Sequence, residues 1–294
     1  MSTLRNPYAP FDAPLKAAFE ANLLAALLED VGTGDLTGQL VQAEGRSTAR
    51  VIVREDAVLC GAPWFEGVML AVDGSIGVTW HYAEGDMMKA DSAVCTLEGP
   101  SRALLTGERA ALNFMQLLSG VATATRRYVQ VVEGTRAKIL DTRKTLPGLR
   151  LAQKYAVRVG GGANQRMALY DGILIKENHI AAAGGITAAL VAAKRVVANT
   201  AANANVTIQV EVENLAELEE ALAAGATSVL LDNFDLGMMR AAVQMNGGRA
   251  LLEGSGGVNL DTVRGIAETG VDRISIGGLT KDVHATDFSL RIVG

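Results

Sequence analysis

The feature that most constrains the fold is a repeat of short apolar segments, each followed by a longer amphipathic one, between residues 137 and 276. Short apolar runs bounded by turn residues predict buried strands, and apolar positions at helical spacing predict helices packed on them. The predicted strands are 137–141, 173–176, 206–212, 228–231, 250–253 and 273–276. The predicted helices are 149–159, 186–197, 215–224, 235–245 and 259–268.

Repeated strand–helix units with short connections form a parallel sheet through right-handed crossovers. The segment therefore predicts either a barrel or a doubly wound layer. Six predicted strands are two fewer than a complete eight-stranded barrel needs.

The N-terminal part of the chain has a different pattern. Asp12 can cap a helix that carries Pro14 in its first turn and extends to about Leu28. Residues 48–98 alternate apolar and polar positions between glycine-bearing turns, which predicts antiparallel strands with one solvated face. Ser101 can begin the next helix.

The end of that helix and the domain boundaries follow from similar signals. We expect the helix to end before Gly120 and a further helix to extend to about Val132. The tail ATDFSLRIVG alternates again, so we expect it to return as a strand to the first domain. The predicted domains are 1–118, completed by 280–294, and 119–279.

Charge and cysteine content exclude several classes of protein. A formal net charge of -5 argues against a general nucleic-acid or membrane-surface binder. The opening residues resemble no signal peptide, and no apolar run reaches membrane-spanning length. Cys60 and Cys95 lack metal-site spacing and are expected to be reduced. We therefore expect a cytoplasmic protein.

Positive charge is concentrated between Ile139 and Lys176, although the whole chain is acidic. Seven cations and two acids leave this segment at +5. A cation is most often a solvated surface side chain, so placement matters more than number. Two predicted strands end next to Arg143, Lys144 and Lys176, and α/β folds bind ligands at the carboxyl ends of their strands.

If the strands are parallel, the residues beyond their carboxyl ends form one ring. That ring is cationic on one side, carboxylate-bearing next to it and glycine-rich at its end. Its members are Thr142, Arg143, Lys144, Lys176, Glu211, Asp232, Asn233, Glu253, Ser255, Gly256, Gly277 and Gly278. The sequence therefore predicts an anionic ligand at this end of the sheet.

The glycine-rich part of the ring predicts a phosphate site. GSGG at 254–257 precedes a predicted helix, and IGG at 276–278 ends the last predicted strand. Backbone N–H groups at such positions can surround a phosphate, and barrel proteins often bind phosphate after their last two strands.

Two carboxylates and one histidine each have two interpretations. Glu211 and Asp232 could form structural salt bridges or hold Mg²⁺, and the neighbouring phosphate site favours Mg²⁺. For His179, a capping or structural role is at least as well supported as one as a general base.

Several motifs in this order resemble the quinolinate phosphoribosyltransferases, also called carboxylating nicotinate-nucleotide pyrophosphorylases. They are EDVGTGDLT, ERAALNFMQLLSGVAT, DTRKTLPGLRLAQKYAVRVGGG, ANQR, LIKENHI, VEVENL, LLDNF, EGSGG and ISIGGLT. The resemblance covers nearly the whole chain. It implies transfer of phosphoribose from phosphoribosyl pyrophosphate to quinolinate with loss of CO₂, giving nicotinate mononucleotide and pyrophosphate in NAD synthesis. It also implies an N-terminal α+β open-faced sandwich, an incomplete parallel α/β barrel and a homodimer.

The resemblance also implies roles for single residues. Quinolinate would be bound by Arg109, Thr142, Arg143, Lys144, Gln165, Arg166 and Lys176. Arg109 would come from the partner subunit of the dimer. The 5′-phosphate would be bound by Ser255, Gly256, Gly277 and Gly278. Glu211 and Asp232 would bind Mg²⁺ and the ribose hydroxyls and, with Lys144 and Lys176, form the catalytic set.

Two positions depart from the family pattern. Many members have NHR where this chain has Asn164, Gln165 and Arg166. Gln165 can donate a neutral hydrogen bond but cannot carry charge or relay a proton. Likewise, Gln209 stands where some members have an acid, which leaves Glu211 as the better metal ligand.

Three other functions compete with this one. The first is a related phosphoribosyltransferase acting on another pyridine or on a molybdenum-linked substrate. The second is a non-catalytic sensing or scaffold protein that kept the fold. The third is another phosphate-binding barrel enzyme, such as an aldolase with a Schiff base on Lys144 or Lys176.

Overall fold

The computed structural model describes residues 3–200 and 206–293, which fall into two compact units. The first unit comprises Met1–Arg126, Thr145–Gly161 and Leu279–Gly294, and the second comprises Arg127–Lys144 and Gly162–Gly278. The predicted domain boundaries stay a prediction. The compact units differ from them in placing residues 119–126 and 145–161 with the first unit.

The first unit begins with a capped helix, α1 (Ala13–Asp30). The Asp12 carboxylate accepts a hydrogen bond from the Leu15 N–H at 2.9 Å and so satisfies one of the free donors at the helix start. A short 3₁₀ helix (Thr37–Leu40) follows within the glycine-bearing turn region. The helix predicted from Asp12 to about Leu28 is thus present and continues two residues further.

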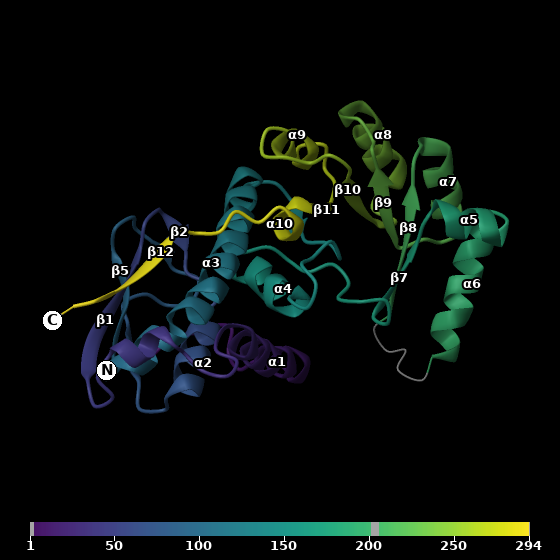
Figure 1. Cartoon of the computed structure of the whole chain (residues 1–294). Helices are drawn as coiled ribbons and strands as arrows, with labels where there is room; N and C mark the ends of the chain where they lie inside the picture. The colour runs from purple at the N-terminus through teal and green to yellow at the C-terminus, as the bar shows by residue number, and fades with distance from the viewer. Residues whose placement is uncertain (1–2, 201–205, 294) are drawn as a thin grey trace. The chain divides into compact units, whose positions relative to one another are not determined.

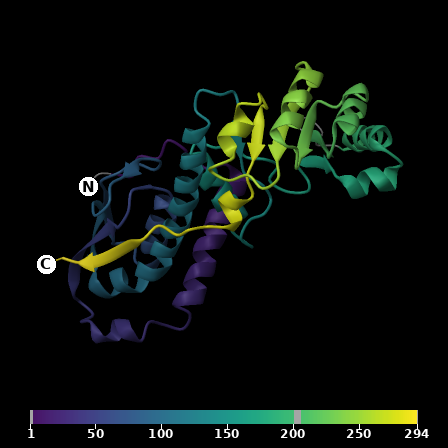
Figure 2. The same ribbon diagram turned by 90° about the horizontal axis from the view of Figure 1, so that it is seen from above.

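Residues 46–100 form most of an antiparallel sheet. Among the described residues this sheet has the order β12-β1-β5-β3, built from β1 (Arg46–Val53), β3 (Gly77–Trp80), β5 (Ala93–Pro100) and β12 (Phe288–Ile292). A smaller pair joins β2 (Ala57–Val58) to β4 (Met87–Met88), and α2 (Ala62–Val72) lies between β2 and β3 in sequence. In Figure 2 the yellow strand β12 lies along the blue strands of this unit, as predicted for the tail.

The helix after Ser101 corrects one prediction. α3 (Ser101–Val131) runs through Gly120 without a break, whereas the sequence predicted two helices separated there. A Cβ on Gly120 would collide with the carbonyl oxygen of His284. The glycine is therefore explained by the close approach of another backbone segment and does not end the helix. Two further helices of this part of the chain are α4 (Arg150–Val159) and α10 (Gly278–Lys281).

The second unit is built on one sheet whose described strands are all parallel, and we call it the parallel sheet. Its described strands are β6 (Lys138–Leu140), β7 (Gly172–Ile175), β8 (Thr207–Val212), β9 (Ser228–Asp232), β10 (Leu251–Ser255) and β11 (Arg273–Ser275). They lie in the order β6-β11-β10-β9-β8-β7, and all their pairings are parallel. All of the predicted strands are therefore present within one or two residues of their expected bounds.

The strand order decides between a barrel and a doubly wound layer. Successive strands from β7 to β11 are neighbours, and β6 lies beside β11, which is the cyclic order of a barrel. A doubly wound sheet would reverse its order at a switch point. Because the described strands include no pairing between β6 and β7, the barrel is not fully closed. The predicted combination of an incomplete parallel barrel and a separate antiparallel sheet is confirmed.

Helices cover one side of the parallel sheet, as Figure 1 shows for α6 (Ile186–Asn199), α7 (Leu215–Ala223) and α8 (Leu236–Asn246). α9 (Val263–Ala267) is shorter than its predicted span of 259–268, because Thr262 closes a turn with Asn259 first. A helix that was not predicted, α5 (Glu177–Ala183), directly follows β7. In the part of the chain that the structure describes, no single helix is long and apolar enough to cross a membrane, and only the sharply bent pair α5 and α6 reaches that length and composition together.

Candidate functional site

The strand ends of the second unit bring most of the predicted site residues together. Thr142, Arg143 and Lys144 follow β6; Gly277 and Gly278 follow β11; Ser255 ends β10 and Gly256 follows it; Asp232 ends β9; Glu211 lies near the end of β8; and Lys176 follows β7. Because neighbouring parallel strands end at the same edge, these residues form the predicted ring, from cationic to glycine-rich to acidic and back to Lys176. Arg109 lies elsewhere, on α3 of the first unit.

A lysine–glutamate pair lies at the acidic side of the ring. Lys176 Nζ contacts both carboxylate oxygens of Glu211, at 3.0 and 2.8 Å. Glu211 is 8% exposed, whereas the lysine side chain is about half exposed. The lysine therefore neutralises a buried carboxylate and still presents its ammonium group to solvent, where an anionic ligand can reach it.

His179 has a structural role at this point. Its Nδ1 accepts a hydrogen bond from the Lys176 N–H at 3.1 Å, which closes a capping arrangement at the start of α5. The imidazole thus satisfies a backbone donor just before the helix. Of the two interpretations of His179, this geometry favours capping.

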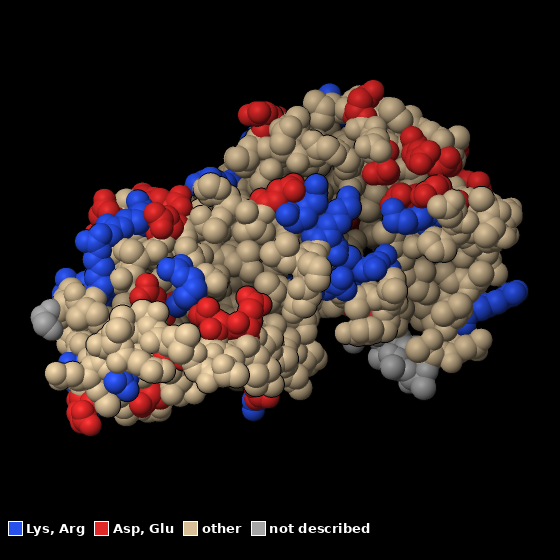
Figure 3. Space-filling view, viewed as in Figure 1, with Lys and Arg blue, Asp and Glu red and all other residues tan. Residues whose placement is uncertain are grey.

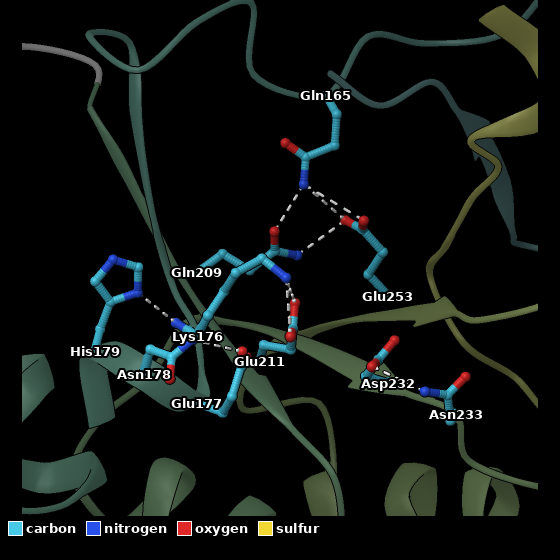
Figure 4. A network of polar contacts seen from close by, with 10 residues as sticks. All are labelled: Gln165, Lys176, Glu177, Asn178, His179, Gln209, Glu211, Asp232, Asn233 and Glu253. Carbon is cyan, nitrogen blue, oxygen red and sulfur yellow. Dashed lines mark hydrogen bonds and ion pairs between the residues drawn. The ribbon is translucent and has the colours of Figure 1, made fainter. Parts of the chain in front are cut away.

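A buried polar network lies deeper in the parallel sheet, and Figure 4 shows its central part. Gln165 Nε2 donates to Gln209 Oε1 at 2.7 Å and lies 3.3–3.4 Å from both oxygens of Glu253. Gln209 Nε2 donates to Glu253 Oε2 at 2.9 Å. Glu253 is 1% exposed, so the two amides provide hydrogen bonds that a buried carboxylate requires.

Asp141 fixes the segment that carries Gln165. Its side chain is fully buried, and it accepts hydrogen bonds from the Gln165 N–H at 2.9 Å and from Asn164 Nδ2 at 2.5 Å. Ala163 forms a parallel bridge with Leu140, so this segment continues the barrel beside β6. The network explains why Gln165 occupies a fixed position at the base of the ring.

Two arginines beside this segment supply concentrated positive charge. Arg166 Nη1 donates to the Gly172 carbonyl at 3.1 Å. Burial of the Arg166 guanidinium and, secondarily, the charge of Arg143 lower the pKa of Arg166. Arg143 Nε is the one buried side-chain N or O atom in residues 3–200 and 206–293 that has no hydrogen-bond partner. An unsatisfied buried donor is costly, and an anionic ligand would satisfy it.

The glycine-rich strand ends allow close backbone approach. Gly256 has a φ of 99°, and a Cβ there would overlap the Asn233 side chain. A Cβ on Gly277 would lie 3.1 Å from Lys144 Cδ, so Lys144 packs directly against this glycine. β10 and β11 are neighbours, which places both glycine-bearing ends side by side. Their N–H groups could surround a phosphate.

The possible metal ligands are few. Glu211 and Asp232 lie near the ends of neighbouring strands, and Asp232 Oδ2 accepts a hydrogen bond from Asn233 Nδ2 at 3.0 Å. Among the described residues, no group of three or more His, Cys, Asp or Glu side chains is arranged to hold a metal ion. Figure 3 shows further acidic side chains grouped over α5 and α7.

Arg109 is placed on an exposed part of α3. Its guanidinium forms a 3.8 Å ion pair with Glu108, and its side chain is 55% exposed. It is thus available to a partner molecule but has no described contact with the residues of the ring.

Sequence reasoning missed part of the site. Asp141 was counted only as a charge, and Glu253 and Asn164 received no role. The sequence gives little indication of these residues, because a polar residue that follows a short apolar run is usually read as the place where the strand ends. The one available clue was that Gln209 and Glu253 are polar residues within two of the predicted apolar strands, β8 and β10.

Comparisons with known proteins agree over most of the chain. Residues 121–291 match the family model described as the quinolinate phosphoribosyl transferase C-terminal domain, and residues 35–119 match the N-terminal domain. A Bacillus subtilis protein described as a probable nicotinate-nucleotide pyrophosphorylase [carboxylating] is 42% identical, over 90% of each chain. The Mycobacterium leprae nicotinate-nucleotide pyrophosphorylase [carboxylating] is 41% identical, over 90% of this chain and 94% of its own.

A solved structure shows the same fold. The nicotinate-nucleotide pyrophosphorylase of Francisella tularensis superposes with a TM-score of 0.90 at 43% identity. The match covers 96% of this chain and 98% of that one.

Proposed function

Because this chain belongs to the quinolinate phosphoribosyltransferase family, we propose that it transfers phosphoribose from phosphoribosyl pyrophosphate to quinolinate. Decarboxylation then gives nicotinate mononucleotide, CO₂ and pyrophosphate, a step of NAD biosynthesis. The observation that best supports quinolinate as the acceptor is the buried, unpartnered Arg143 Nε beside Arg166. Two forked guanidinium groups suit a substrate with two carboxylates.

The cationic side of the ring would bind and orient quinolinate. Arg143, Arg166 and Lys144 would hold its carboxylates, with Thr142 and Gln165 as neutral hydrogen-bonding groups. The buried network fixes Gln165 through Asp141 and Glu253. A rigid base of this kind would hold the ring nitrogen in line with C1′ of the ribose, which is the main requirement for the transfer.

The opposite side would bind the phosphoribosyl donor. Ser255, Gly256, Gly277 and Gly278 would hold the 5′-phosphate through backbone N–H groups. Lys176 would face the pyrophosphate, and its ion pair with Glu211 fixes its ammonium group at the mouth of the sheet. The nitrogen–C1′ bond forms as the C1′–oxygen bond breaks, and negative charge grows on the departing pyrophosphate. Lys176 would stabilise that charge.

Decarboxylation needs no further group. After transfer, the ring nitrogen is cationic, so the electron pair of the breaking carbon–carboxylate bond is stabilised by that charge as CO₂ leaves. The carbon then takes a proton. Because Gln165 cannot relay a proton, we assign it to positioning.

Mg²⁺ fits the acidic part of the ring. Two carboxylates without a closed set of protein ligands suit an ion that takes its remaining ligands from water and substrate phosphates. We propose that Glu211 and Asp232 hold it; when bound, it would neutralise charge on the pyrophosphate group. The test is calorimetry of phosphoribosyl pyrophosphate binding with Mg²⁺ or with EDTA. Asp232→Asn should reduce the metal-dependent gain, and an equal gain in that variant would contradict the assignment.

We further propose a homodimer whose sites each take Arg109 from the partner subunit. Its support is the exposure of Arg109 on α3, outside the unit that carries the ring. The test mixes inactive Arg109→Ala and Lys176→Ala proteins and allows subunit exchange. Restored activity of about a quarter of the wild-type value is expected, since half of the two-fold dimers would hold one intact site. No recovery despite proven exchange would contradict the lent arginine. Cytoplasmic location stays a prediction.

The function itself is tested by supplying quinolinate, phosphoribosyl pyrophosphate and Mg²⁺ and measuring nicotinate mononucleotide. Nicotinate, which has one carboxylate, is the matched control substrate and should react poorly. Equal rates with both would refute the role of the arginines. Absence of nicotinate mononucleotide from well-folded protein would refute the function.

A further inference from the structure

The parallel sheet has a second hollow, at the end opposite the ring. A cavity of about 700 Å³ is lined by residues at the amino ends of the strands, including Lys138 of β6, Arg273 of β11, Ser228 of β9 and Thr207 of β8, and by residues 163–166. All of its lining residues belong to the second unit. We call it the amino-end cavity.

The lining of the amino-end cavity consists of apolar groups and hydrogen-bond donors. Its charged residues are Lys138, Arg166 and Arg273, and no Asp or Glu is among the described residues that line it. The hydroxyl groups of Thr207 and Ser228 add neutral donors. This composition is typical of a site that receives an anion.

Two of the cations are direct neighbours. Lys138 and Arg273 are register partners on parallel strands, so both side chains leave the same face of the sheet. Like charges at such positions destabilise a sheet unless something compensates for them. Among the described residues, neither side chain forms a hydrogen bond or an ion pair.

The nearest acids in register are already occupied. Glu253 is the register partner of Arg273 on β10, but its carboxylate accepts hydrogen bonds from Gln165 and Gln209. Asp272 is paired with Arg136 and accepts from the Leu252 N–H at 2.9 Å. The positive charge of Lys138 and Arg273 therefore has no matched carboxylate in the sheet.

One hollow at the opposite edge of the sheet has a lining of the opposite charge. A smaller hollow of about 280 Å³ near the carboxyl ends of β7 and β8 is lined by Glu177, Glu211, Glu213, Glu217 and Glu220. No Lys or Arg is among the described residues lining it. The two hollows of the same sheet thus have opposite charge.

We propose that the amino-end cavity is a second anion-binding site, for a small multiply charged oxyanion such as an organic phosphate or a polyphosphate. Lys138 supplies a point charge and Arg273 a planar fork, the two groups that bind phosphate oxygens. The volume of about 700 Å³ lies within the range of sites for small metabolites. Gln165 and Arg166 line both this cavity and the proposed quinolinate site, so the proposal rests on Lys138 and Arg273, which have no role in the ring.

The test uses pyrophosphate as the probe and the intact protein. Acetylation of single lysines is followed by mass spectrometry, with and without the anion. Lys138 is exposed and is expected to be acetylated at least fivefold more slowly when pyrophosphate is bound. Lys194, an exposed lysine on α6 that contacts the backbone of residues 224 and 225, is the matched control and should not change.

Two variants separate this site from the ring. Arg273→Gln should abolish the protection of Lys138. Lys176→Gln, which weakens pyrophosphate binding at the ring, should leave that protection intact. The proposal is overturned if Lys138 is not protected in the wild-type protein, if Lys194 is protected equally, or if Lys176→Gln removes the effect. The wild-type measurement decides even if Arg273→Gln fails to fold.

Discussion

Each unit contains a buried carboxylate cluster, and the two clusters are satisfied in different ways. In the first unit, Glu84 is 1% exposed and accepts hydrogen bonds from the N–H groups of Gly61 and Ala62 at 2.8 and 3.1 Å and from Tyr155 Oη at 3.0 Å. In the second, Asp141 and Glu253 are held mainly by the side-chain amides of Asn164, Gln165 and Gln209 and by one backbone N–H.

The surroundings of the two clusters also differ. Tyr155 packs against Phe11 and Trp64, with ring centroids 5.2 and 5.3 Å apart, so the Glu84 cluster is sealed by aromatic rings. The Asp141 and Glu253 cluster is in the same unit as Arg143, whose buried Nε has no hydrogen-bond partner. The comparison indicates that the first cluster serves stability, whereas the second supports a site in which Arg143 Nε still has a hydrogen bond to offer a ligand. Each prediction below tests this division, in order of decreasing effect.

The largest expected effect is that of Arg143→Ala on catalysis. Loss of a buried charged hydrogen-bond partner costs about 2–5 kcal/mol, so kcat/KM for quinolinate should fall by roughly 30- to 4,000-fold. The melting temperature should not fall, because the variant also removes an unsatisfied donor. Steady-state kinetics and thermal unfolding measure both. Arg195→Ala, on the exposed side of α6, is the control. A melting temperature that falls together with activity would show that Arg143 serves stability and not only ligand binding.

A smaller loss is expected for Lys176→Gln. Removal of one electrostatic group at a developing charge typically lowers kcat about 10²-fold or more. The change also leaves the buried Glu211 without its cation, so some loss of stability accompanies it. Kinetics under saturating phosphoribosyl pyrophosphate measure the effect. A change confined to the KM for quinolinate would show that Lys176 does not act on the leaving group.

Glu84 should affect stability and not catalysis. Burial raises the pKa of Glu84 from 4.5 to about 7, although its hydrogen bonds oppose the shift. A raised pKa in the folded state means that the folded protein binds the proton more tightly. The contribution of Glu84 is therefore fully present below about pH 4.5 and is lost as pH rises to about 7, by roughly 3 kcal/mol in total.

The measurement is the free energy of unfolding of the wild type and of Glu84→Gln between pH 5 and 8. The wild type should lose stability over this range, and the variant should lack that component. Glu98→Gln, an exposed carboxylate on β5, is the control and should retain the wild-type slope. The kcat of Glu84→Gln should stay at the wild-type value. A pH-independent difference between wild type and variant would contradict the raised pKa.

The smallest effect is expected from Gln165→His. Imidazole can donate one hydrogen bond in place of the amide but cannot reproduce both the contact to Gln209 and that to Glu253. The KM for quinolinate should change only a few-fold and should gain a pH dependence near the usual histidine pKa of about 6.5. Measuring KM from pH 5.5 to 8 tests this. A pH-independent KM would show that the charge of the side chain at position 165 does not affect quinolinate binding.

The sequence predicted the regular part of the second unit well and its interior poorly. The strands from residue 206 to residue 276 follow from short apolar runs, which are local signals. The network does not, because Gln165 meets Glu253 across 88 residues of sequence. Gly120 shows the same limit, since its partner at His284 is distant in the chain, and a glycine in a helix resembles a break until that partner is known.

The pairing of β1 with β12 has a consequence for the order of events during synthesis. Residues 49–53 find their partners only at residues 288–292. At ribosomal speeds of about 5–20 residues per second, the nascent sheet would wait for its last strand for roughly ten seconds to a minute. During that interval β1 presents an unpaired edge, so a chaperone that shields nascent strands would find its target in the earliest part of this chain to emerge.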